Sequence, residues 1–124
     1  MAKPKANTDP AYQAKLAAYR RLLANFPDVE LKGATIPYTA INGNMFSYLH
    51  PDGAMALRLA PADREAFLAT YGTTLFHAYG IIQKEYVTVP VGLFDDTDQL
   101  RPHFQASFDY VRTLKPKATK KKNA

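Results

Sequence analysis

AINGNMFSYLHPDGAMALRL, residues 40–59, is the stretch of sequence that decides the fold. It contains two turn sequences that lie close enough together to fix three antiparallel strands. Asn42-Gly43 is typical of a two-residue type I′ turn, because both central positions of that turn need a positive φ. Pro51-Asp52-Gly53 favours a three-residue turn, with Pro at its fixed φ and Gly in the left-handed position. The sequence therefore predicts a three-stranded meander between about residues 35 and 60.

The two turns also predict which side chains share a face of the sheet. Counting outward from the first turn gives the pairs Ala40 with Met45, Tyr38 with Ser47, and Ile36 with Leu49. Counting from the second turn gives Leu49 with Met55, Ser47 with Leu57, and Met45 with Leu59. Because side chains alternate along a strand, we expect a core face that carries Met45, Leu49, Met55, Leu57 and Leu59. The other face is expected to carry Thr39, Phe46, Tyr48, Ala56 and Arg58, with Arg58 opposite Phe46.

Helices are predicted on both sides of the meander. Thr8 or Asp9 can cap a first helix, with Pro10 at its first position and Pro27 at its end. The apolar stripe of this helix is Tyr12, Leu16, Tyr19, Leu23 and Phe26. A second helix begins at Pro61 and ends at Gly72, and its apolar residues are Phe67, Leu68 and Tyr71.

A fourth strand and a last helix complete the predicted fold. Residues 84–89 alternate, with Val87 and Val89 on one face and Lys84, Tyr86 and Thr88 on the other. The last helix begins at Thr97 or Asp98, and its stripe is Leu100, Phe104, Phe108, Val111 and Leu114. We therefore expect an α+β fold in the order helix, three strands, helix, strand, helix. The helices should pack on one face of an antiparallel sheet, and Pro37 places the first strand at an edge.

Length and charge suggest one domain between two tails. The 124 residues suffice for a single domain, which we place at residues 9–114. Residues 1–8 and the Lys-rich residues 115–124 are expected to be disordered. Seven of the 16 basic residues lie in these tails, which leaves 9 basic against 11 acidic residues in the body, a net charge of −2. The sequence has no cysteine, no signal peptide and no apolar run of membrane-spanning length. We therefore expect a cytoplasmic protein with no membrane partner.

A family resemblance rests on an ordered set of short segments. They are Asn42-Gly43-Asn44-Met45-Phe46, Leu57-Arg58-Leu59-Ala60-Pro61, Tyr79-Gly80, the strand from Lys84 to Pro90, Leu93-Phe94-Asp95-Asp96, and Tyr110 to Lys117. Together they resemble the TfoX N-terminal domain family of bacterial proteins over about residues 33–117. The family's usual glycine pair after Met-Phe is Ser47-Tyr48 here. The resemblance implies an α+β domain without an established enzymatic activity.

The residues that could carry catalysis or hold a metal show no matching pattern. His50, His77 and His103 have no ligand neighbour at helical spacing. The acidic cluster Asp95, Asp96 and Asp98 lacks the glycine and the terminal Glu of a calcium loop and favours a helix start instead. Ser47 and Ser107 lie in no nucleophile elbow. We therefore expect a protein that is not an enzyme and that needs neither a cofactor nor a metal.

Two surfaces remain as candidates for binding. The outer sheet face would gather Phe46, Tyr48, Arg58, Lys84 and Tyr86, which could meet a protein partner or a second copy. Alternatively, that face is covered by residues 73–82. The tail lysines could bind nucleic acid weakly and without sequence preference, or serve only solubility; they are Lys115, Lys117, Lys120, Lys121 and Lys122. The leading interpretation is a protein-interaction domain that forms a homodimer through the outer sheet face or the edge strand near Pro37. The alternative is an accessory nucleic-acid-binding or regulatory protein.

Overall fold

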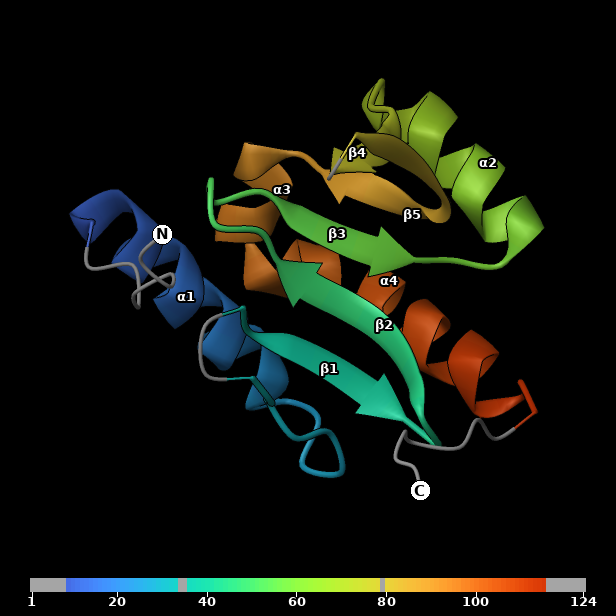
Figure 1. Ribbon diagram of the computed structural model, residues 1–124, viewed down its shortest axis with the longest axis horizontal. Helices are drawn as coiled ribbons and strands as arrows, with labels where there is room; N and C mark the ends of the chain where they lie inside the picture. The colour runs from blue at the N-terminus through green and yellow to red at the C-terminus, as the bar shows by residue number, and fades with distance from the viewer. Residues whose placement is uncertain (1–8, 34–35, 79, 116–124) are drawn as a thin grey trace.

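The α+β class predicted from the sequence is confirmed, with a larger sheet than expected. The computed structural model describes residues 9–33, 36–78 and 80–115 (Figure 1), so the predicted tails lie almost wholly outside the described residues. The described residues form a five-stranded antiparallel sheet with strand order β1-β2-β3-β5-β4. The elements are α1 (Pro10–Leu23), β1 (Tyr38–Ile41), β2 (Asn44–Leu49), β3 (Met55–Arg58), α2 (Pro61–Tyr71), β4 (Leu75–Ala78), β5 (Ile81–Val89), α3 (Val91–Asp95) and α4 (Thr97–Arg112).

Both predicted turns of the meander are confirmed. Asn42 and Gly43 have φ of 54° and 80°, and they connect β1 to β2 as the two central residues of a tight hairpin. The second turn is closed by His50, whose amide donates to the Ala54 carbonyl at 2.8 Å. Gly53 inside that turn has φ of 93°, which a residue with a side chain rarely adopts.

The register of β1 against β2 differs from the prediction at one residue. Ala40 pairs with Met45 as expected, but Thr39 pairs with Ser47 and Tyr38 with Tyr48. Strand β2 therefore contains one extra residue, Phe46, which makes a β-bulge. A bulge interrupts the alternation of side chains, and counting from the turn could not detect it.

The bulge exchanges side chains between the two faces. Phe46 is fully buried in the core beneath the helices, and Met45 lies on the opposite face, so both face assignments were wrong. Thr39 also lies on the core side, where its hydroxyl contacts Ser47 Oγ at 2.6 Å. The pairs of β2 with β3, Leu49 with Met55 and Ser47 with Leu57, are as predicted.

The predicted fourth strand is one half of a hairpin. It extends back to Ile81 as β5. A turn that contains Gly80, whose φ is 77°, connects it to the preceding strand, β4. Strand β4 was missed because it has only four residues and includes the exposed His77. The short helix α3 was missed as well.

The helices cover one face of the sheet. In Figure 1, α4 runs behind β1, β2 and β3, α1 lies at one side of the molecule, and α2 lies beside β5. Helix α1 begins at Pro10 as predicted, with Asp9 as its cap, but it ends at Leu23 rather than at Pro27. Gly72 ends α2 at φ of 61°, and Asp96 caps α4. The core between these layers includes Leu49, Met55, Leu57, Leu59, Val87 and Val89, all on the predicted face.

Candidate interaction face

The face of the sheet opposite the helices is curled inward, and we call it the concave face. Tyr48 in β2 and Phe76 in β4 are separated by two strands, yet their ring centroids are 5.5 Å apart. In a flat sheet, strands at about 4.8 Å spacing would hold these residues about 14 Å apart. Ala56, which pairs with Tyr48 in the adjacent β3, belongs to the same apolar cluster, and its small side chain leaves room for the rings. The curl buries Tyr48 and Phe76 to 3% exposure each.

Four hydrogen bonds tie the concave face together where β3 ends. Tyr48 donates from its hydroxyl to Gln83 Oε1 at 2.6 Å, and Tyr86 donates to the Met45 carbonyl at 2.8 Å. Arg58 reaches the same carbonyl from Nη1 at 3.3 Å and pairs with Glu85 Oε1 from Nε at 2.6 Å. The Met45 carbonyl therefore accepts two of these hydrogen bonds, one from Tyr86 and one from Arg58.

Burial keeps the Tyr86 phenol in its neutral, donating form. Desolvation raises the pKa of Tyr86 to about 12, and the nearby Arg58 guanidinium opposes this shift. The phenol is therefore protonated at neutral pH and can donate to the Met45 carbonyl. The floor of the concave face is therefore held in place before any partner binds.

Three hollows of the concave face meet at Met45. The first has a volume of about 290 Å³ and is mainly apolar; it is lined by Ile36, Tyr38, Met45, Tyr48 and Gln83. The second, of about 410 Å³, is lined by Met45, Arg58, Ile81, Gln83, Lys84, Glu85 and Tyr86. The third, of about 260 Å³, is lined by Lys32, Tyr38, Ala40, Asn42, Gly43 and Met45. Since Met45 lines all three, we call these hollows together the Met45 groove.

Four of the five residues predicted for this face lie on it. Arg58, Lys84 and Tyr86 line the second hollow and Tyr48 lines the first. Phe46 is not among them, because the bulge turns it toward α4, where its ring centroid lies 5.4 Å from that of Phe104. The segment 73–82 does cover part of the face, since Phe76 packs on Tyr48.

Sequence reasoning missed several lining residues, among them Met45, Gln83 and Ile81. Met45 was assigned to the other face, and Gln83 preceded the predicted strand. Ile81 is 61% exposed, which is unusual for a large aliphatic side chain beside an apolar hollow. The adjacent isoleucines Ile81 and Ile82 after a glycine were the available signal for an exposed apolar hairpin.

The outer edge of β1 is occupied by the chain itself. Tyr38 exchanges both backbone hydrogen bonds with Lys32, at 2.8 and 3.0 Å. The connection turns sharply at Gly33, whose φ is +90°, and a Cβ there would stand 2.3 Å from the Ile36 carbonyl oxygen. The predicted use of the edge near Pro37 for pairing with a partner is therefore blocked at Tyr38.

The C-terminal tail leaves the fold beside the groove. Asn44 Nδ2 donates to the Lys115 carbonyl at 3.2 Å, next to the turn that lines the third hollow. The other predicted tail residues, Lys117, Lys120, Lys121 and Lys122, lie outside the described residues. The basic tail therefore begins at Lys115, whose carbonyl is hydrogen-bonded to the first residue of β2.

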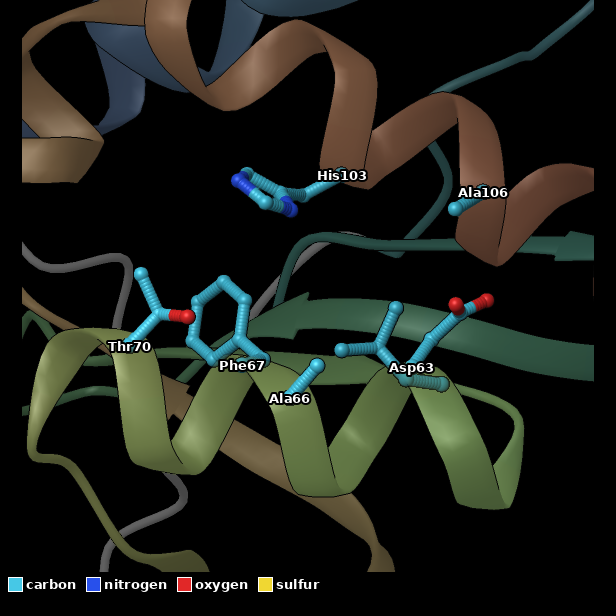
Figure 2. A pocket seen from close by; sticks show the side chains of 7 residues that line it. Asp63, Ala66, Phe67, Thr70, His103 and Ala106 are labelled. Carbon is cyan, nitrogen blue, oxygen red and sulfur yellow. The ribbon is translucent and has the colours of Figure 1, made fainter.

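A separate hollow of about 130 Å³ lies between α2 and α4 (Figure 2). It is lined by Leu59, Asp63, Ala66, Phe67, Thr70, His103 and Ala106. His103 Nε2 is 2.8 Å from the Tyr71 hydroxyl, and its ring stands edge-on to Phe67 with centroids 5.1 Å apart. Burial lowers the pKa of His103, and the nearby Asp63 carboxylate opposes this shift.

Several of the other candidate chemical groups have structural partners. Asp95 pairs with Lys15 at 3.0 Å, Asp96 caps α4, and His50 Nδ1 lies 3.0 Å from Asp52. Ser47 Oγ lies 2.6 Å from both the Tyr19 and the Thr39 hydroxyls. Within residues 9–33, 36–78 and 80–115, no three His, Cys, Asp or Glu residues gather as metal ligands would. Over the same residues, no helix has the length and apolar character needed to cross a membrane.

Comparison with known proteins adds no relative. No protein-family model matches the chain, and no match is found among curated proteins or among solved structures.

Proposed function

We propose that this protein is a non-enzymatic protein-interaction domain whose first partner is a second copy of the same chain. The observation that carries the proposal is the combination, on one face, of an apolar hollow and an exposed apolar side chain. The hollow is the first one of the Met45 groove, and the side chain is Ile81 at the rim of the second. Each copy therefore has both the exposed apolar side chain and the apolar hollow that could receive it from another copy.

A two-fold axis satisfies both contacts at once. In a two-fold symmetric dimer both copies use the same surface patch, so every contact between the copies occurs twice. Ile81 of one copy can enter the hollow lined by Ile36, Tyr38 and Met45 of the other, and the reverse contact follows from symmetry. Exposed apolar side chains beside an apolar groove commonly mark such interfaces.

Charges at the rim fit the same arrangement. Lys84 and Glu85 both line the second hollow, and Lys32 lines the third. When two copies face each other, each brings both a cation and a carboxylate to the rim, so opposite charges can be placed together. Such pairs contribute more to the orientation of the two copies than to affinity.

The decisive experiment compares two equally exposed apolar residues. Ile81→Asp places a charge in the proposed interface, whereas Val91→Asp is the matched control, because Val91 is 62% exposed and lines none of the three hollows. Sedimentation equilibrium should show a dimer for the natural chain and for Val91→Asp, and a monomer for Ile81→Asp. A natural chain that is monomeric at high concentration, or a dimer unaffected by Ile81→Asp, would overturn the proposal.

The proposal accords with the family resemblance. The segments similar to the TfoX N-terminal domain include both the first turn of the meander and the strand from Lys84 to Val89, which supply six of the fourteen residues that line the groove. We propose membership of that family and a cytoplasmic location on the residues alone. That resemblance implies an α+β domain without an established enzymatic activity.

A second candidate function, accessory binding of nucleic acid, is favoured by one contact. The hydrogen bond from Asn44 to the Lys115 carbonyl holds the first residue of the basic tail beside the third hollow. Lys32 lines the same hollow. Five lysines between residues 115 and 122 would supply affinity for phosphates. Binding through the tail is compatible with the dimer, because the tail does not have to enter the groove.

A further inference from the structure

The hollow between α2 and α4 exists because small side chains face each other across the two helices. Ala66 on α2 and Ala106 on α4 leave space that a larger pair would fill, and Leu59 lies beneath them. Figure 2 shows the side chains of Asp63, Ala66, Phe67 and Thr70 directed toward α4, with His103 and Ala106 above them. The hollow is thus a gap built into a helix-helix contact and lies apart from the concave face.

The walls of the hollow combine one negative charge with aromatic surface. Asp63 is the only ionised side chain that lines it, and it stands at the opposite end from Thr70 and His103 (Figure 2). The Phe67 and His103 rings stand nearly perpendicular to each other at 88°. Tyr71 holds His103 in place through Nε2, outside the hollow.

The imidazole adds no positive charge to the hollow at neutral pH. Burial lowers the pKa of His103, so the neutral ring predominates there. A ligand with a positive head would then meet the Asp63 carboxylate and the ring faces without repulsion. Carboxylates and aromatic faces are the two groups that proteins use most often to hold organic ammonium ions.

We propose that this hollow binds a small alkylammonium group, with its charge at Asp63 and its alkyl chain between Phe67, Ala66 and Ala106. The volume of about 130 Å³ admits a short chain of a few carbon atoms. The same chemistry is found in a free small amine and in a lysine side chain of another polypeptide. This inference is independent of the dimer and of the Met45 groove.

The test uses n-butylammonium chloride as the probe and the full chain as the receptor. Amide NMR spectra recorded during titration should show shifts at residues 59–70 and 103–106, with a dissociation constant on the order of millimolar. n-Butanol, which has the same shape and no charge, should bind roughly tenfold more weakly. Sodium chloride at equal concentration controls for ionic strength, and Nα-acetyl-lysine amide, if it binds more tightly than butylammonium, identifies a polypeptide lysine as the source.

Two variants and one matched control make the test specific. Asp63→Asn should weaken butylammonium binding roughly tenfold without affecting the fold, because Asp63 is exposed. Glu65→Gln removes a charge from the same helix but not from the hollow, so binding should change by less than about twofold. Ala106→Leu should abolish binding by filling the space. Equal affinity for butanol, no effect of Asp63→Asn, or the absence of the localised shifts would overturn the proposal.

Discussion

Two fully buried serines have opposite surroundings, and this contrast predicts opposite effects of the same substitution. Ser47 Oγ bridges the Tyr19 and Thr39 hydroxyls at 2.6 Å each, whereas Ser107 Oγ is buried without a hydrogen-bond partner in the described structure. Ser47→Ala should lower the free energy of unfolding by about 1–3 kcal/mol, because it leaves two buried hydroxyls without their partner. Ser107→Ala should be neutral or stabilising, because it removes a buried hydroxyl that makes no hydrogen bond. Urea unfolding of both variants checks the prediction, and equal losses would contradict it.

His103 makes the stability of the chain depend on pH in a predictable direction. Its pKa is lowered by burial from the ordinary value of 6.5, so the unfolded chain binds more protons in the interval between the folded and unfolded pKa values. The stability that this residue confers is therefore complete above about pH 6.5 and is lost as the pH falls through the folded pKa. Asp63 and Tyr71, both on α2, are the described groups that act on the ring.

The measurement compares unfolding free energies at about pH 7.5 and about pH 5.5. His103→Gln should lose part of the pH dependence of the natural chain. His77→Gln is the matched control, because His77 is exposed on β4. If both variants keep the full pH dependence, the environment of His103 is not the cause.

At the scale of the element, the β-bulge in β2 is the feature that most changes the surface. It turns Phe46 toward α4 and Met45 toward the groove. Phe46→Ala should therefore cost about 3–5 kcal/mol of unfolding free energy, and Met45→Ala less than about 2 kcal/mol, because Met45 is only half-buried. Strict alternation from the first turn predicts the opposite ranking. Thermal unfolding of the two variants decides between the registers.

Most elements could be predicted because each has a local signal. Asn42-Gly43, Asp9-Pro10 and Gly72 encode a turn, a helix start and a helix end through their own backbone preferences. The bulge, β4 and α3 have no such signal, because they depend on how distant segments pack. Phe76, for example, belongs to a strand that curls over Ala56 to reach Tyr48. The aromatic and basic residues of the face were therefore identifiable, whereas Met45 and Gln83 were not.

At the scale of the whole molecule, positive charge and folded structure are separated along the chain. The body from Asp9 to Leu114 has a net charge of −2, and the remaining residues carry seven lysines. Removing residues 116–124 deletes four lysines, so the slope of log affinity for single-stranded DNA against log salt should fall in magnitude by about 3. Fluorescence anisotropy with a labelled oligonucleotide measures both slopes.

The full chain with those four lysines changed to Gln is the control for tail length. It should behave like the shortened chain, and its dimer should be unchanged. Undiminished binding by the shortened chain, abolished by Tyr86→Ala, would instead place the nucleic-acid site in the Met45 groove.

The backbone bridge between Lys32 and Tyr38 has a consequence for the fate of the protein at high concentration. A free outer strand can recruit copy after copy into an open-ended fibril, and this chain closes off that route with its own main chain. The closure depends on Gly33, where any side chain would collide with the Ile36 carbonyl. A chain with a larger residue there would retain its core and its groove and yet lose its protection against fibrillation. Gly33 thus helps to keep the edge of β1 at Tyr38 from pairing with another chain.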